Sequence, residues 1–90
     1  MNNIYVSRNE DAAYRIIDHE ALIVVPGNNT LYVLNRVGAR IWEVAIGKVR
    51  MEDLAETICG EFNVTYDLAL SDINQFVNEL SLKGLLEIKS

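Results

Sequence analysis

The side chains that most often carry catalysis or bind metals are scarce and isolated in this sequence. There is one histidine, His19, and one cysteine, Cys59. Zinc ligands occur as clusters of such residues, so no metal site is expected. The serines lack a Gly-x-Ser-x-Gly setting, and His19 falls in an expected turn, which disfavours a Ser-His-Asp triad. We therefore predict that the protein is not an enzyme, with no catalytic residue, no metal and no cofactor.

The length and the net charge of the chain disfavour further classes of function. Ninety residues predict a single domain, residues 1–90. A chain of this length buries only roughly 60–65% of its unfolded surface, which leaves little room for an enzyme active site beside a core. The net charge is −5, and nucleic-acid binding needs the opposite sign. No nucleic-acid partner is expected.

Nothing in the sequence predicts a membrane or secreted protein. No apolar run reaches the roughly 18 residues of a membrane helix. The start, Met1–Tyr5, has neither the basic nor the apolar region of a secretory signal. The single cysteine cannot form an internal disulfide. We expect a cytoplasmic protein with no membrane partner.

Three short strands are predicted near the start of the chain, after a polar lead-in at 1–13 that has room for a short strand around Ile4–Val6. The strands cover 14–18, 21–25 and 31–34. Asp18-His19-Glu20 is the first turn, although these are not the residues that favour a tight primed turn. Pro26–Thr30 is a strong turn signal. The arrangement predicted is an antiparallel meander.

The second and third strands are apolar on both faces. Leu22 and Val24 point to one side and Ile23 and Val25 to the other. A sheet with one face in water alternates more cleanly. Either helices or the lead-in segment cover both faces, or one face or edge is kept for a partner.

Three helices follow, at 36–46, 51–62 and 66–83. Asn35 and Thr65 are good N-cap residues, whereas Arg50 is a weak one. Lys48–Arg50 is a connection, and Leu85–Ile88 is a strand or tail. Three strands followed by three helices predict an α+β fold, a three-stranded antiparallel sheet with a winged helix-turn-helix-like set of helices.

A DNA-reading role can be tested on the third helix. Its face away from the apolar stripe carries Asp67, Asp72 and Glu79, with Lys83 near the end. Such a surface repels phosphates, which disfavours a transcriptional regulator. Peptide binding remains, because an exposed strand edge can accept one more strand. A strand of four to six residues gives a groove roughly 13–20 Å long.

Several motifs resemble the PqqD-type family, whose members are also called RiPP recognition elements, and the match runs from Arg15 to Leu86. The matching stretches lie in the same order and spacing and are Arg15-Ile16-Ile17-Asp18, Ala21-Leu22-Ile23-Val24, Tyr32-Val33-Leu34-Asn35, Gly38-Ala39-Arg40-Ile41-Trp42-Glu43, Glu52-Asp53-Leu54-Ala55, Glu61-Phe62-Asn63-Val64, Asp72-Ile73, Phe76, Glu79-Leu80 and Gly84-Leu85-Leu86. The Leu-Asn-x-x-Gly-Ala-x-Ile-Trp run is the most specific. The turn Val25–Asn29 departs from the Tyr-Pro-Glu-Gly type of the pyrroloquinoline quinone pathway, so the pathway stays open.

The resemblance implies a site formed by the third strand and the third helix. The leader segment of a ribosomally made precursor peptide would add as a strand to Leu31, Tyr32, Val33 and Leu34. The implied residues of the third helix form an apolar wall and a polar rim, and they are Ile73, Phe76, Val77 and Leu80 for the wall and Asp72 and Gln75 for the rim. For each of the four wall residues, a place in the hydrophobic core is at least as compatible with the sequence as a place in the peptide groove.

The function predicted is that of a non-catalytic chaperone for a precursor peptide. It would present the peptide to a modifying enzyme, either a radical S-adenosylmethionine protein or a leader peptidase. Two alternatives are a winged helix-turn-helix regulator and a module that docks only a folded enzyme.

Overall fold

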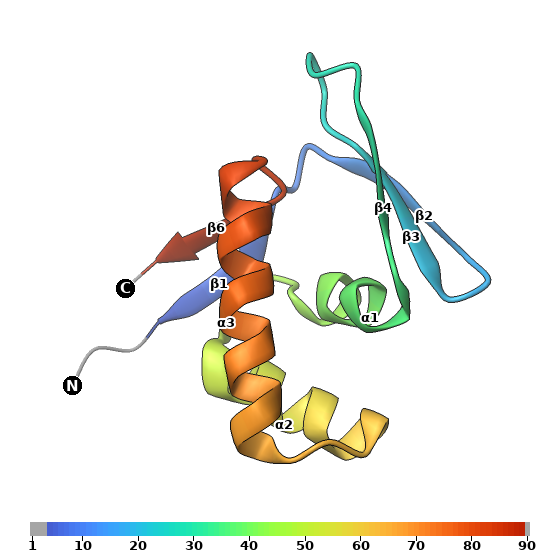
Figure 1. Ribbon diagram of the computed structural model, residues 1–90. Helices are drawn as coiled ribbons and strands as arrows, with labels where there is room; N and C mark the ends of the chain where they lie inside the picture. The colour runs from blue at the N-terminus through green and yellow to red at the C-terminus, as the bar shows by residue number, and fades with distance from the viewer. Residues whose placement is uncertain (1–3, 90) are drawn as a thin grey trace.

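The structure is a computed structural model, and it describes residues 4–89. Nine elements follow one another along these residues (Figure 1). In chain order they are β1 (Tyr5–Arg8), β2 (Ala13–Ile17), β3 (Glu20–Val24), β4 (Leu31–Leu34), α1 (Arg36–Val44), β5 (Val49–Arg50), α2 (Met51–Phe62), α3 (Tyr66–Leu82) and β6 (Leu86–Lys89).

The predicted meander is confirmed as the antiparallel sheet β2-β3-β4. A two-residue turn joins β2 to β3, and both of its residues have positive φ, 49° at Asp18 and 67° at His19. This is the backbone of a primed turn, which matches the twist of the flanking strands. Aspartate tolerates the left-handed region better than most residues, and the tight turn fixes the register of Ile17 opposite Glu20.

A second sheet was not predicted from the sequence. Its order is β5-β1-β6, with β1 antiparallel to both neighbours. The short strand expected in the lead-in and the strand or tail expected near the end are thus paired with each other. The expected connection at 48–50 is partly wrong, because Val49–Arg50 pairs with Tyr5–Val6 as β5.

The helix boundaries follow from local capping. Asn35 Oδ1 accepts from the Gly38 N–H at 2.9 Å, and Thr65 Oγ1 accepts from the Leu68 N–H at 3.3 Å. Arg50 makes no side-chain cap, and instead the Met51 N–H donates to the Ile4 carbonyl at 3.0 Å. The residue that precedes β1 thereby satisfies one of the free donors at the start of α2.

Two helix ends differ slightly from the predicted ones. Helix α1 ends at Val44, before the predicted Ile46, because Ala45 leaves the helical conformation. Helix α3 ends at Leu82 and closes in a Schellman motif, in which Leu85 N–H donates to Leu80 C=O at 2.9 Å. Gly84 has φ 78° there, and this reversal turns the chain into β6.

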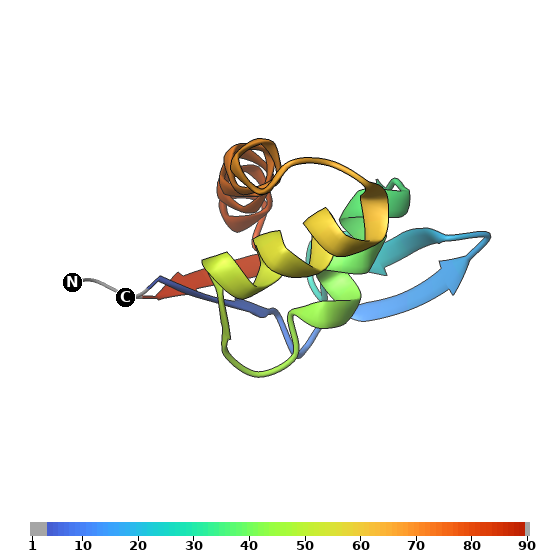
Figure 2. The same cartoon turned by 90° about the horizontal axis from the view of Figure 1, so that it is seen from below.

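One core joins both sheets to the helices. The largest fully buried side chains come from every layer, and they are Val6, Ile23, Ile41, Trp42, Leu54, Ile73, Val77 and Leu85. Figure 1 draws α2 below α1, and Figure 2, seen from below, shows α2 crossing in front of α1, with the β2–β3 hairpin extending away from the helices. Of the two alternatives for the meander, coverage of both faces is wrong, because the face opposite the core exposes Ile17, Val24, Leu31 and Val33.

Candidate functional site

The free edge of the meander is strand β4. Within residues 4–89, β4 pairs with β3 alone. Figure 1 shows β4 as the strand of its sheet nearest to α3, with α1 beginning at its lower end. An unpaired strand edge offers a row of N–H and C=O groups that can bind one more strand.

The hairpin turn decides which groups β4 offers. The two residues that flank a two-residue hairpin turn exchange both main-chain hydrogen bonds. Ile17 and Glu20 flank this turn, so the polar groups of Glu20 point toward β2. Because these directions alternate along a strand, the polar groups of Ala21 and Ile23 point toward β4.

Strand β4 alternates in the same way. Leu34 and Tyr32 lie opposite Ala21 and Ile23, and therefore direct their main-chain groups toward β3. Leu31 and Val33 direct theirs toward the free side. The outward donors and acceptors of the edge consequently belong to Leu31 and Val33.

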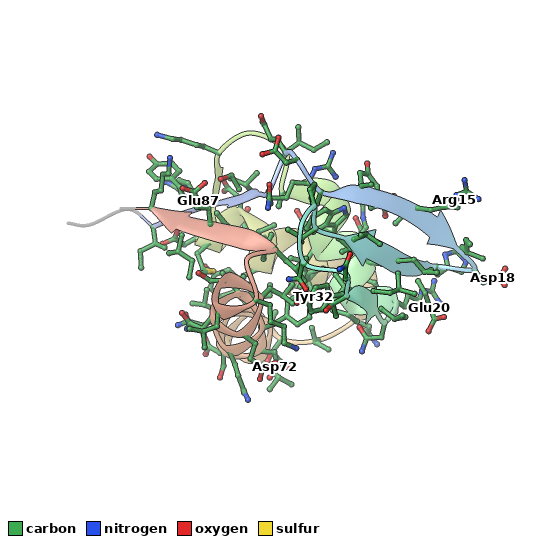
Figure 3. The ribbon with its side chains drawn as sticks, turned by 90° about the horizontal axis from the view of Figure 1, so that it is seen from above. Arg15, Asp18, Glu20, Tyr32, Asp72 and Glu87 are labelled. Atoms are coloured by element: carbon green, nitrogen blue, oxygen red, sulfur yellow. The ribbon has the colours of Figure 1, made fainter. Side chains whose placement is uncertain are left out.

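The side chains of β4 also alternate. Leu31 and Val33 are each 56% exposed, whereas Leu34 is buried. Tyr32 is half-buried and lies between β4 and α3 in Figure 3. The strand thus presents apolar side chains to solvent on one face and contributes to the core on the other.

Helix α3 separates the predicted wall residues into two groups. Ile73, Val77 and Leu80 are buried in the core, so the core alternative holds for these three side chains. Phe76 is half-buried, and the predicted rim residues Asp72 and Gln75 are exposed. A peptide-binding role for any of them stays a prediction.

Two contacts connect α3 with β4 and the start of α1. The Lys83 Nζ lies 6.0 Å from the centre of the Tyr32 ring, at the outer limit of a cation–π contact. Further down the helix, Phe76 packs on Gly38, where an added Cβ would lie only 2.7 Å from Phe76 Cζ. Glycine at 38 therefore permits the close approach of α3 to α1.

A small apolar cavity of about 280 Å³ opens beside the Phe76 contact. It lies among the three helices, close to where β4 ends. Most of its lining is aliphatic or aromatic, with one amide and one carboxylate, and the residues are Asn35, Val37, Gly38, Ile41, Ile58, Phe62, Val64, Ala69, Asp72, Ile73 and Phe76. Of the predicted site residues, the cavity brings together Asp72, Ile73 and Phe76.

Several residues around this site were not predicted as part of it. Gly38 and Asn35 line the cavity, and Lys83 contacts Tyr32. One sequence signal was present, because a glycine inside a helix usually has a packing reason. Lys83 carried no comparable signal, since its contact depends on how α3 lies against the sheet.

The strongest ion pair lies on the far side of α1. Arg40 donates to Glu61 through Nε at 2.8 Å and through a terminal nitrogen at 3.0 Å, which joins α1 to α2. This hydrogen bonding lowers the pKa of the Glu61 carboxyl and raises the pKa of Arg40. Both side chains are partly exposed, so we read the pair as a surface contact between the two helices, of small energy, and not as a reactive site.

Other classes of site find no support in residues 4–89. No group of three or more His, Cys, Asp or Glu side chains is arranged there to hold a metal ion. No helix formed by those residues has the length and apolar character needed to cross a membrane. The arrangement can bind an extended chain by main-chain hydrogen bonds and receive an apolar side chain in the cavity.

Comparison with known proteins finds one family model and one solved structure that match this chain. The family model described as coenzyme PQQ synthesis protein D (PqqD) matches residues 20–86. A solved structure, "TbiB1 in Complex with the TbiA(beta) Leader Peptide", matches with a TM-score of 0.80 and 27% sequence identity. The match covers 90% of this chain and 94% of that chain. Among curated proteins, no relative matches the chain.

Proposed function

The chain belongs to the PqqD family, and on that premise we propose that it binds the leader segment of a ribosomally made precursor peptide. The bound precursor is then presented to a modifying enzyme. The observation that carries the proposal is the unpaired edge of β4, next to α3, in a fold shared with a protein described in complex with a leader peptide.

The leader adds as a further strand to β4. Its main chain bonds to the outward groups of Leu31 and Val33, while alternate side chains face α3. One apolar leader side chain enters the cavity beside Phe76. The protein itself is non-catalytic, acts in the cytoplasm, and serves either a radical S-adenosylmethionine protein or a leader peptidase.

The charge of α3 disfavours the regulator alternative. Asp67, Asp72 and Glu79 are exposed on this helix, and none of them takes part in an ion pair within the described residues. A recognition helix of this charge would repel the phosphate backbone. An acidic helix beside an apolar edge is compatible with a peptide that carries basic residues.

The first test is a backbone-amide NMR titration of the labelled protein. The ligand is the leader segment of the precursor peptide encoded with this protein, and a scrambled peptide and a DNA duplex serve as controls. We expect shifts confined to β4, α3 and the cavity with the leader alone. Salt-sensitive shifts along α3 with DNA, and none with the leader, would favour the regulator.

A substitution tests the edge itself. Val33→Pro removes an outward N–H without removing a bond to β3, and proline is tolerated at such edge positions. We expect the leader Kd to rise at least about tenfold, the loss of roughly one hydrogen bond with its register. Val33→Ala is the matched control, because it shortens the side chain and keeps the N–H. Unchanged affinity in a folded Val33→Pro protein would exclude this edge as the site.

A further inference from the structure

The face of the β2-β3-β4 sheet that points away from the core, called here the outer face, is mostly apolar. The strand register assigns eight positions to this outer face, and they are Ala13, Arg15, Ile17, Glu20, Leu22, Val24, Leu31 and Val33. Six of the eight are apolar. The two charged residues lie at its margins, as Figure 3 shows for Arg15 and Glu20 near the far end of the sheet.

The apolar residues of the outer face are accessible to solvent. Leu31 and Val33 are each 56% exposed, Ile17 is 45% exposed and Val24 is 41% exposed. Leu22, at the centre, is half-buried by its neighbours in the sheet. Monomeric proteins seldom leave a contiguous apolar patch without an interaction partner.

Arg15 adds a specific polar feature. It lies opposite Leu22 on the edge strand β2 and makes no ion pair with the described residues of this chain. Arginine beside an apolar centre is the composition of protein interfaces, where charged lysine and glutamate are depleted. A partner surface with an apolar centre and a carboxylate opposite Arg15 would match it.

The size of the outer face disfavours a second copy of this chain. A stable interface buries about 800 Å² on each partner and uses roughly 20–30 residues a side. The outer face has eight positions, too few for a stable symmetric dimer, whereas an enzyme that binds the domain transiently and also contacts the leader needs less area on this face. A peptide strand does not fit it either, because strands add at edges and leave faces uncovered.

The outer face is continuous with the proposed leader site. Leu31 and Val33 direct their main-chain groups toward the free edge and their side chains onto the outer face. A leader strand added to β4 would extend the sheet and place every second side chain on the same face. A protein that contacts this face across β3 and β4 would therefore contact the leader as well.

We infer that the outer face docks the modifying enzyme, through a flat apolar surface on that enzyme with a carboxylate opposite Arg15. This inference rests on the proposed function. The enzyme binds the extended sheet, so the leader strengthens its attachment and the enzyme in turn strengthens leader binding. The cavity and α3 hold the leader, while the outer face determines where the reactive site of the enzyme is positioned.

Val24→Lys tests the inference because it adds a charge to the middle strand of the outer face, opposite Leu31, and leaves the outward main-chain groups of Leu31 and Val33 in place. The matched control is Ile46→Lys, which makes the same kind of change at a residue that is 65% exposed and does not belong to the outer face. The probes are the leader peptide and the purified modifying enzyme encoded with the precursor. Each probe is titrated by calorimetry, the enzyme both with and without leader.

We expect Val24→Lys to raise the Kd for the enzyme at least tenfold and to leave the leader Kd unchanged. Ile46→Lys should change neither. The wild-type enzyme Kd should fall when leader is present. If Val24→Lys destabilises the fold, Arg15→Glu gives the same test at the margin, with the same loss of enzyme binding.

Other results would overturn the inference. Unchanged enzyme binding in both Val24→Lys and Arg15→Glu would exclude the outer face as the docking site. Sedimentation showing a wild-type dimer that Val24→Lys dissociates would assign the face to a second copy. Failure of the proposed function is distinguishable, because it would appear as no leader binding by the wild-type protein, whatever the enzyme titration shows.

Discussion

The two sheets of this domain have three strands each, but the edge strands β6 and β4 expose different kinds of side chain to solvent. In the β5-β1-β6 sheet, Val6 and Leu86 are buried, and the exposed residues of the edge strand β6 are Glu87 and Lys89. In the β2-β3-β4 sheet, the exposed residues of the edge strand β4 are Leu31 and Val33. The first edge carries charges and the second carries none.

This difference shows which exposed side chains the fold requires on an edge strand and which are better explained by a binding partner. Charged side chains on an edge strand prevent it from pairing with other chains, and the Glu87–Lys89 ion pair at 3.6 Å provides them on β6. Strand β4 has the same length and an equally free edge but lacks this protection. Apolar exposure at Leu31 and Val33 is therefore not required by the architecture, which supports a binding role for that sheet.

The largest expected effect compares one valine from each sheet. Val6 is fully buried and Val33 is 56% exposed. Val6→Ala should lower the free energy of unfolding by about 2 kcal/mol, because it removes packed methyl groups and leaves a cavity. Val33→Ala should change it by no more than about 0.5 kcal/mol. Urea unfolding measures both, and equal losses would contradict the division between the sheets.

An exchange of edge residues tests the comparison directly. Leu31→Glu combined with Val33→Lys gives β4 the charge pattern of β6. We expect the leader Kd to rise at least about tenfold, because charged side chains disfavour strand addition, while the unfolding midpoint stays close to that of the wild type. Calorimetry with the leader measures the affinity.

The reverse exchange is the control for that experiment. Glu87→Leu combined with Lys89→Val gives β6 an apolar edge. The cavity beside β6, of about 760 Å³, is lined mostly by polar and charged residues, unlike the apolar one lined by Phe76. This variant should leave the affinity for the leader as it was. A charged β4 edge that still binds the leader with wild-type affinity would show that edge chemistry does not distinguish the two sheets.

The smallest expected effect concerns the ion pair that joins α1, which follows the β2-β3-β4 sheet, to α2, which follows a strand of the β5-β1-β6 sheet. Helix α1 follows β4 and α2 follows β5, so Arg40–Glu61 links the two at the surface. Glu61→Gln should lower the unfolding midpoint slightly at neutral pH. Because the pKa of Glu61 is lowered in the folded state, this contribution is present above the ordinary carboxyl pKa of about 4.3 and is lost as the pH falls through the folded value.

Urea unfolding of both proteins across the acid range checks this pH dependence. The midpoints of wild type and Glu61→Gln should converge as the carboxyl becomes protonated. A difference that persists in acid would assign the effect to packing. A large difference between the two midpoints at neutral pH would mean that the packing of α1 against α2 depends on the Arg40–Glu61 pair more than on the shared core.

Sequence patterns predicted the elements whose signals are local. The bounds of Leu31–Leu34 and Met51–Phe62 were predicted as the structure has them, because a strong turn precedes the strand and a 3.6-residue stripe spans the helix. The caps at Asn35 and Thr65 were also predicted and are confirmed. Each of these features depends on residues within a few positions of one another.

The remaining features depend on distant partners. Pairing of Tyr5 with Lys89 leaves no periodic trace that either segment shows alone. An apolar strand face looks the same in sequence whether the chain or another protein covers it, so the outer face could not be assigned. On α3 the apolar stripe includes Ile73, Phe76 and Val77, and only the packing distinguishes the buried Ile73 and Val77 from the half-buried Phe76.

The pairing of β1 with β6 also affects the order in which the domain folds. It joins Tyr5 to Lys89, a separation of 89 − 5 = 84 positions, whereas the β2–β3 turn closes between Ile17 and Glu20. Closing a long loop costs more entropy than closing a short one, and contacts distant in sequence slow folding. The sheet proposed to bind the peptide is therefore expected to form early and locally, and the rate of the final folding step is set by the sheet that joins the two ends of the chain.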